Sequence, residues 1–250
     1  ERSDPSITRQ AVSFPVGAPS SKEIARSVRI AEIRDLATGV KLLKLEDPDG
    51  LPLPAWTPGA HIDLVLGEFT RKYSLCGHAS DQGYTIAVLR EDDGRGGSRF
   101  IHEQLSAGML VRIRGPKNYF RLEEQADRHI LIAGGIGITP IVAMADRLKA
   151  LGCDYVVHYC GRRRDAMAFA DRLAGDHGDR LVLHVSAEGS RADSAQIVGD
   201  WTEGMRVHAC GPQSLLDDLS GLCKRMPEGA FKCEAFNADT AGGAHADDTA

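Results

Sequence analysis

A glycine-rich turn in the second half of the chain has the residues needed to hold a phosphate. Gly134-Gly135-Ile136-Gly137-Ile138-Thr139-Pro140 directly follows the apolar run at 129–133. Glycine lets the backbone turn tightly and approach a ligand closely. Thr139 and Pro140 are expected as the N-cap and first residue of a helix whose free N–H groups attract phosphate. The spacing differs from the G-x-G-x-x-G fingerprint of dinucleotide-binding proteins. The alternative to nucleotide binding is therefore a purely structural turn between a strand and a helix. Two adjacent glycines and a capped helix favour nucleotide binding.

A second turn, Cys210-Gly211-Pro212, also follows an apolar run and precedes a helix pattern. In open α/β sheets, ligands bind at the carboxyl ends of strands, near the point where the winding reverses. Both turns are expected at such ends. The Cys210 thiol is small and polarizable enough to lie against a nicotinamide ring, and the alternative is a buried cysteine that only packs.

Two segments nearer the N-terminus could hold a flat, anionic ligand. Arg71-Lys72-Tyr73-Ser74-Leu75 combines a planar cation that suits phosphate with an aromatic ring that can stack. Gly94-Arg95-Gly96-Gly97-Ser98 precedes a predicted helix at 98–105, with Ser98 as its N-cap, and makes a second anion cradle. Taken alone, the first segment is typical of a surface strand and the second of a solvated hairpin loop. Together with the two glycine turns, they indicate two phosphate-bearing ligands, one in each half of the chain.

The elements that must position these segments differ between the two halves. From 26 to 115, short alternating segments are broken by turn residues, which predicts an antiparallel β-barrel or sandwich. These segments lie at 28–33, 41–45, 61–66, 84–89 and 110–113.

Beyond residue 116, nearly continuous apolar runs alternate with helix patterns, which predicts a doubly wound α/β fold with a parallel sheet. The runs lie at 129–133, 155–159, 181–185 and 207–210, with a last strand at 231–236. Helices are expected from Pro140, at 166–174, and after Pro212, where Leu215, Leu219, Leu222 and Met226 share one face.

Composition narrows the class of protein. The 250 residues carry a formal charge of −5, which gives no general affinity for nucleic acid or anionic membranes. The longest apolar runs are too short to span a bilayer. The six cysteines lack zinc or iron–sulfur spacing, so we expect no metal ligands and mostly buried, reduced thiols in a cytoplasmic protein.

The four segments, in this order and spacing, resemble the ferredoxin-reductase superfamily. The similarity is closest to reductases of the phthalate dioxygenase reductase and vanillate demethylase reductase type, and it covers about 26–238. It implies a Greek-key flavin barrel at 24–120 and an NAD-binding α/β domain at 121–237. We expect a flexible arm at 1–23 and a linker at 238–250.

The resemblance also implies the site residues. The FMN site is expected at Arg71, Tyr73, Ser74, Leu75, Val88, Leu89, Arg90, Gly96, Gly97, Ser98, Thr139, Glu234 and Phe236. The NAD site is expected at Gly134, Gly135, Gly137, Ile138, Arg162, Asp165, Cys210, Gly211 and Pro212. Ser74, Thr139 and Cys210 are the catalytic candidates, because they are expected beside the reacting rings. The short G-R-G-G-S cradle without an adenine-binding segment resembles the FMN branch rather than the FAD branch.

Nucleotide preference is expected to depend on Gly161-Arg162-Arg163-Arg164-Asp165. An acidic residue there favours the 2′-hydroxyl of NADH and an arginine the 2′-phosphate of NADPH. Both types are present, so NADPH is the alternative, and the resemblance favours NADH.

The implied function is a reductase that passes electrons from NADH through FMN to a [2Fe-2S] centre and on to a Rieske-type oxygenase or demethylase. Family members usually carry a [2Fe-2S] domain, whose ligand spacing is absent here, so we expect a continuation beyond Ala250 or a separate ferredoxin. One alternative is an NAD(P)H:flavin reductase that releases free reduced flavin. Another is a flavin-holding relay subunit without its own NADH activity, against which both glycine turns speak.

Overall fold

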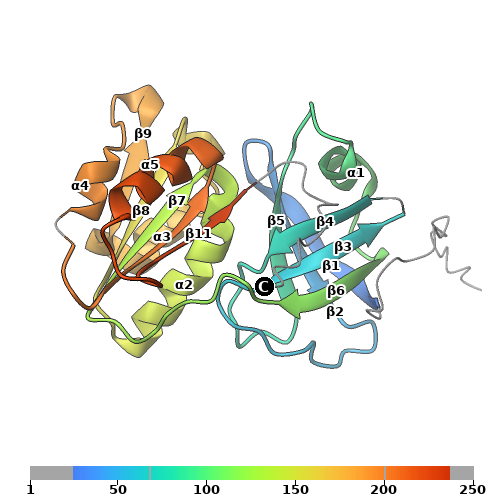
Figure 1. The fold of residues 1–250 in the computed structure, drawn as a ribbon. Helices are drawn as coiled ribbons and strands as arrows, with labels where there is room; N and C mark the ends of the chain where they lie inside the picture. Colours follow the sequence, from blue (N-terminus) through green and yellow to red (C-terminus); the bar gives the residue numbers. More distant parts are fainter. Residues whose placement is uncertain (1–24, 68, 200, 237–250) are drawn as a thin grey trace, which may run out of the picture.

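Alternating apolar residues build the first half of the chain into one antiparallel sheet (Figure 1). The computed structural model describes residues 25–67, 69–199 and 201–236. The strands are β1 (Arg26–Ala37), β2 (Val40–Glu46), β3 (His61–Leu66), β4 (Phe69–Ser74), β5 (Tyr84–Leu89) and β6 (Leu110–Lys117), and α1 (Gly97–Gln104) lies between the last two. Their order in the sheet is β4-β3-β6-β1-β2-β5. The sheet curls so that its two edges meet, where the Cys76 N–H donates to the Thr85 carbonyl at 2.9 Å.

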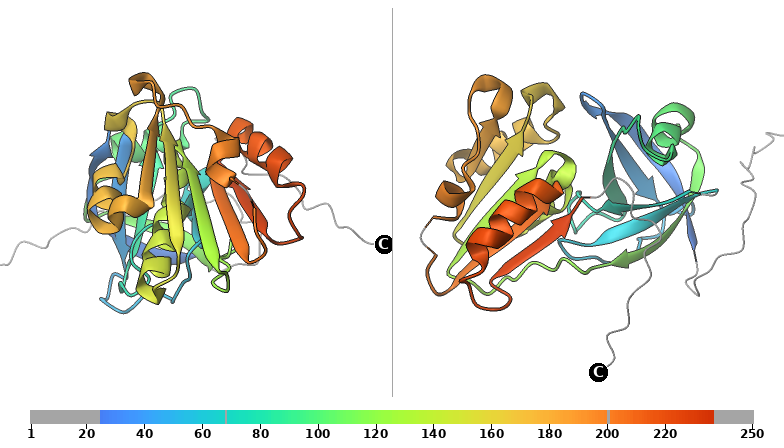
Figure 2. Two further views of the ribbon diagram at one scale, coloured as in Figure 1. Left: turned by 90° about the vertical axis from the view of Figure 1, so that its left-hand side faces the viewer. Right: turned by 45° about the horizontal axis from the view of Figure 1, so that its top comes forward.

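The second half forms a five-stranded parallel sheet with the order β11-β10-β7-β8-β9. Its strands are β7 (Arg128–Gly134), β8 (Tyr155–Gly161), β9 (Leu181–Val185), β10 (Met205–Gly211) and β11 (Phe231–Ala235), and its helices are α2 (Ile138–Leu151), α3 (Ala170–His177), α4 (Ser194–Val198) and α5 (Gln213–Cys223). One face packs on α2 and α3, and the opposite face on α4 and α5 (Figure 2). The winding reverses between β7 and β10, as the doubly wound prediction requires. The predicted fold class is therefore confirmed.

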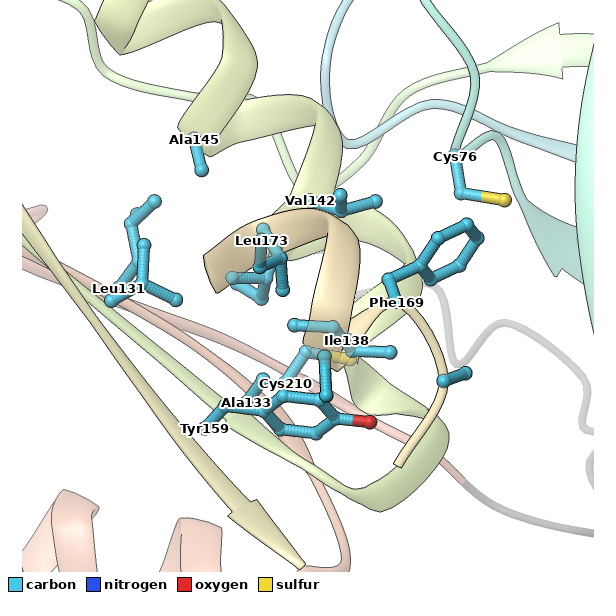
Figure 3. Packing of buried hydrophobic residues seen from close by; sticks show 14 of the residues in the cluster. Cys76, Leu131, Ala133, Ile138, Val142, Ala145, Tyr159, Phe169, Leu173 and Cys210 are labelled. Atoms are coloured by element: carbon cyan, nitrogen blue, oxygen red, sulfur yellow. The ribbon is translucent and has the colours of Figure 1, made fainter. Parts of the chain in front are cut away.

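A shared apolar core joins the two halves. Val40 and Cys76 from the barrel belong to the same buried cluster as Ile138 and Val142 of α2. Figure 3 shows the Phe169 ring directed toward Cys76, across the seam between the halves. Because this seam is apolar, its burial stabilises the halves against one another.

Two helix starts differ from the predictions. The helix α2 begins at Ile138 with Gly137 as its N-cap, so Thr139 and Pro140 lie inside its first turn. A 3-10 turn at Gly135–Gly137 runs directly into α2, and helical bonding therefore starts earlier than the threonine suggests. The prediction of Ser98 as an N-cap is also wrong, because α1 begins at Gly97 after the left-handed Gly96.

Two further helices also differ from the predictions. The helix α3 begins at Ala170, after a 3-10 turn at Arg164–Ala166, rather than at residue 166. In α5, Leu216, Leu219 and Cys223 are buried while Leu222 is 43% exposed, so the predicted apolar face is rotated. The short helix α4 was not predicted.

No described helix has both the length and the apolar composition needed to cross a membrane. The six cysteines are free thiols. Within the described ranges, no three His, Cys, Asp or Glu side chains gather as a metal site. The predicted arm at 1–23 and linker at 238–250 lie outside the described residues.

Candidate functional site

A cavity lies where β4 and the end of β5 face the end of β11. Its volume is about 910 Å³ when the space at its mouth is included. The barrel contributes residues from β4, from the end of β5 and from the loop before α1, and the α/β domain contributes the end of β11. The lining consists of Arg71, Lys72, Tyr73, Ser74, Leu89, Glu91, Gly94, Arg95, Gly96, Gly97, Ser98, Glu234, Ala235 and Phe236.

The start of α1, the predicted anion cradle, lies in this cavity. Gly96 adopts φ 87°, a conformation that glycine reaches without strain, and no side chain caps the helix. The first turn holds no acidic residue. The Ser98 hydroxyl accepts a hydrogen bond from the Glu91 N–H at 3.1 Å, which ties the helix start to the strand exit. Helix N-termini of this kind bind phosphate groups.

Arg71 lies directly against this cradle. A Cβ atom built on Gly97 would stand 2.9 Å from Arg71 Nε and 3.2 Å from its Cγ. Glycine at 97 therefore lets the arginine stem pack on the loop. The guanidinium also donates to the Thr70 carbonyl at 3.0 Å and lies over the Phe69 ring. A fixed planar cation beside uncapped N–H groups fits a phosphate-bearing ligand.

Opposite charges meet across the cavity. The Lys72 ammonium donates to the Glu234 carboxylate at 2.5 Å, which joins β4 of the barrel to β11. Tyr73 is buried, and burial raises the pKa of its phenol, so the ring is neutral in the physiological range. Tyr73 and Phe236 give the lining its two aromatic rings.

Nine of the predicted flavin residues line this one cavity, although they come from four separate segments. They are Arg71, Tyr73, Ser74, Leu89, Gly96, Gly97, Ser98, Glu234 and Phe236. Leu75 and Val88 are fully buried in the barrel core instead. Arg90 turns to the surface, where it pairs with Asp92 at 2.7 Å and Glu103 at 2.8 Å.

The two glycine turns lie side by side at the strand ends, where the winding reverses. A Cβ on Gly137 would come within 2.3 Å of the Cys210 carbonyl oxygen, and one on Gly134 within 2.7 Å of Pro212 Cδ. These glycines therefore let the ends of β7 and β10 pack together. Gly135 is different, because it has φ 54° and no atom within 4 Å of its Cβ position. Of the three glycines, Gly135 is the one with open space for a ligand.

The two remaining catalytic candidates are covered. The Thr139 hydroxyl donates to the Ile136 carbonyl at 3.2 Å, inside the turn. Cys210 is fully buried, and Figure 3 shows it beside Ala133, Ile138 and Tyr159. Burial, followed by the nearby Glu234 carboxylate, raises the pKa of the Cys210 thiol, so it stays protonated. Neither side chain is in the cavity lining described above.

The candidate ribose-reading residues follow β8. Arg162 is exposed. The Asp165 carboxylate accepts from Arg163 at 2.9 and 2.6 Å and from the Thr38 hydroxyl at 2.9 Å. Hydrogen bonds from Arg163 and then Thr38 hold the pKa of Asp165 below its usual value. Asp165 therefore also anchors this loop to the barrel.

β11 connects the cavity to the glycine turns. Its residues pair in parallel with β10, so that Glu234 lies opposite Cys210. The Phe236 N–H then donates to the Gly211 carbonyl at 3.0 Å. The same short strand thus lines the cavity and flanks the Cys210-Gly211-Pro212 turn. A ligand in the cavity and a nucleotide on the strand ends would lie next to each other.

The predictions missed five lining residues, namely Lys72, Glu91, Gly94, Arg95 and Ala235. Lys72 and the pair Gly94-Arg95 lie within segments that the sequence singled out. Glu91 and Ala235 carry no separate signal, because they reach the cavity only through the strand ends on which they lie.

Comparisons with known proteins give close relatives over most of the chain. Phenoxybenzoate dioxygenase subunit beta of Ectopseudomonas oleovorans is 40% identical over 218 residues, covering 86% of this chain and 68% of that protein. The structure titled phthalate dioxygenase reductase, a modular structure for electron transfer from pyridine nucleotides to [2Fe-2S], superposes with a TM-score of 0.80 at 32% identity, covering 84% of this chain and 68% of that one.

A second solved structure is an intact type IV self-sufficient cytochrome P450 monooxygenase. It superposes with a TM-score of 0.84 at 41% identity, and the match covers 89% of this chain but only 30% of that one. A scan against family models finds no match. The chain spans about two thirds of the length of the curated relatives it matches.

Proposed function

The chain belongs to the family of oxygenase reductase components that includes phthalate dioxygenase reductase, and on this premise we propose that it is an NADH-dependent FMN reductase. Its proposed task is to take electrons from NADH and deliver them through FMN to a [2Fe-2S] centre. That centre would lie in a further domain or in a separate ferredoxin. NADPH in place of NADH, and FAD in place of FMN, are the alternatives that the experiment below distinguishes.

The barrel residues would hold the flavin. The uncapped start of α1, with Gly96 and Ser98, would bind the flavin phosphate together with Arg71. Tyr73 and Phe236 would contact the flat ring, and the Ser74 hydroxyl would hydrogen-bond near its reacting nitrogen. When bound, the flavin supplies the ability to accept a pair of electrons and release them singly, and the protein supplies orientation and electrostatics.

The strand ends of the α/β domain would hold the nicotinamide nucleotide. Gly135 leaves open space at the start of α2, where a pyrophosphate would meet backbone N–H groups. The turn at Cys210-Gly211-Pro212 would flank the nicotinamide. Because Phe236 bonds to Gly211, this turn adjoins the flavin cavity. Such fixed proximity of two rings is the main contribution that a protein makes to electron transfer between them.

One observation carries the proposal: a single cavity collects residues from the barrel strand, the cradle loop and β11, the strand that pairs with the second glycine turn. A relay subunit without NADH activity has no need for the glycine turns.

We propose a Rieske-type oxygenase as the final acceptor, reached directly or through a ferredoxin. A dioxygenase subunit and phthalate dioxygenase reductase among the relatives support this class. The similarity to a cytochrome P450 monooxygenase supports a haem acceptor as the second candidate. Mixing the reduced chain and a [2Fe-2S] ferredoxin with each kind of oxygenase, and measuring product, separates the two.

The direct test uses the purified chain. We expect a yellow protein whose flavin survives gel filtration, is released as FMN on denaturation, and bleaches when NADH is added without oxygen. Flavin that is lost on the column would indicate the flavin-releasing reductase. Flavin that is retained but not bleached by NADH or NADPH would indicate the relay subunit.

The phosphate assignment has its own test in Ser98→Asp. A carboxylate at the start of α1 would repel the flavin phosphate, so we expect at least tenfold weaker FMN binding, or about 1.4 kcal/mol. The matched control is Ser98→Asn, which has nearly the same shape without the charge and should bind FMN at least several times more tightly than Ser98→Asp. Equal FMN affinity of the two variants would show that the flavin phosphate does not bind at the start of α1.

A further inference from the structure

Lys72 was not among the predicted flavin residues, yet it forms an ion pair between β4 of the barrel and β11 at the cavity. Its ammonium lies 2.5 Å from Glu234 Oε1, and the two residues are 162 positions apart in sequence. Both side chains line the cavity. The contact therefore joins the half that would hold the flavin to the strand that flanks the nicotinamide turn.

The local register explains why Lys72 is available for this role. Asp63 is its cross-strand neighbour on β3. The Asp63 carboxylate has a second cation, since Lys117 Nζ lies 3.5 Å from it. Lys72 can therefore turn toward β11 without leaving Asp63 uncompensated. Tyr73, the next residue on β4, packs on the barrel core and also lines the cavity.

Glu234 is a partly buried carboxylate between the cavity and the Cys210 turn. Its side chain is 18% exposed, against 44% for Lys72. The pairing of β10 with β11 puts it opposite Cys210. Both charges of the ion pair act on the Cys210 thiol. Burial raises its pKa most, the Glu234 charge raises it further, and the Lys72 charge lowers it.

We propose that Lys72 is a positioning residue that neutralises Glu234 and holds it at the barrel edge of the cavity, so that the carboxylate does not oppose negative charge on a reduced flavin. This inference rests on the proposed function, and it adds a residue that sets the reduction potential. Without Lys72, an uncompensated carboxylate would face a ring that becomes more electron-rich on reduction. Without Glu234, an uncompensated ammonium would face the same ring.

The pair lends itself to a charge-specific test because its lysine is 44% exposed, and solvent screening keeps the contribution of such pairs to stability small. We therefore expect Lys72→Met and Glu234→Gln to unfold in urea near the wild-type midpoint. The readout is the midpoint potential of the bound flavin, measured against a reference dye. Removal of either charge should change the relative affinity for reduced and oxidised flavin about tenfold, which is about 30 mV for a two-electron couple.

The expected shifts have opposite signs. Lys72→Met should lower the potential, Glu234→Gln should raise it, and the double variant should return toward wild type. Lys72→Arg should keep the wild-type value. The matched control is Lys44→Met, which removes a cation from another ion pair of the barrel, with Glu32 at 3.0 Å, away from the cavity lining.

Shifts of the same sign for Lys72→Met and Glu234→Gln, or shifts no larger than that of Lys44→Met, would overturn the inference while the proposed function stands. A wild-type chain that binds no flavin would instead overturn the proposed function, and the inference with it.

Discussion

Gly137→Ala tests whether the glycine turn after β7 is a packing requirement or only a ligand site. A Cβ at position 137 would lie 2.3 Å from the Cys210 carbonyl oxygen, 2.5 Å from the Cys210 carbonyl carbon and 2.8 Å from Gly211 Cα. All three atoms belong to the backbone of β10, so no side chain can rotate away. To relieve this clash, the turn and the β10 backbone must move apart by about 1 Å, which restores normal van der Waals contact.

That shift would disturb the pairing of Cys210 with Ala133, which is part of the parallel sheet between β7 and β10. Overpacking against side chains costs typically 1–3 kcal/mol, and main-chain obstacles lie at the upper end, so we expect a loss of about 3 kcal/mol. Gly137 itself has φ −59°, where alanine is favoured by roughly 0.5–1 kcal/mol over glycine. Any destabilisation therefore comes from the close approach and not from the dihedral angle.

Gly135→Ala is the matched control in the same turn. Its φ of 54° strains an alanine by about 1–2 kcal/mol, but its Cβ would meet no atom within 4 Å. With a urea m-value of about 2 kcal/mol per M, the midpoint should fall by about 1.5 M for Gly137→Ala and by about 0.5–1 M for Gly135→Ala. Urea unfolding followed by circular dichroism measures both. A Gly137→Ala midpoint equal to wild type, or above that of Gly135→Ala, would refute the packing argument.

Two further predictions concern acid stability. Burial, with Lys72 and Lys117 adding to it, lowers the pKa of His61 to about 3, whereas an unfolded histidine titrates near 6.5. The unfolded chain thus binds the proton first, and stability falls as pH drops from about 6.5 toward 3. His61→Gln should reduce the loss between pH 7 and pH 5 by about 2 kcal/mol, and an unchanged loss in urea titrations would contradict this. For Asp146, burial alone would raise the pKa, but hydrogen bonds from His177 and Arg172 hold it below its usual value. Its contribution is present above about pH 4 and is lost below it, so Asp146→Asn should cost about 2 kcal/mol at pH 7 and little at pH 2, measured by thermal unfolding.

Local patterns determined most of the elements. The strands β3, β5 and β9 have the predicted bounds, because alternating or continuous apolar residues are a property of neighbouring positions. The same holds for the two turns that end β7 and β10. Helix starts were less accurate: Thr139 and Ser98 have good capping side chains, but glycines earlier in each turn let the helix begin before them.

The candidate site was identified by its segments rather than by its contacts. The sequence indicated Arg71 and the cradle at 94–98 from their own side chains, and the family resemblance added Phe236. The structure then separated those residues that reach the cavity from Leu75 and Val88, whose side chains pack in the core. Strand alternation alone does not reveal which of two faces is covered.

The contacts between distant segments were decided only by the tertiary structure. Lys72 and Glu234 meet because the sheets close on a shared apolar seam, and nothing in the residues around either one encodes the other. The need for glycine at 137 arises in the same way, from the carbonyl of a strand about 70 residues later in the sequence. Periodicity and turn chemistry act over a few residues, whereas these contacts depend on how two folded layers are placed against each other.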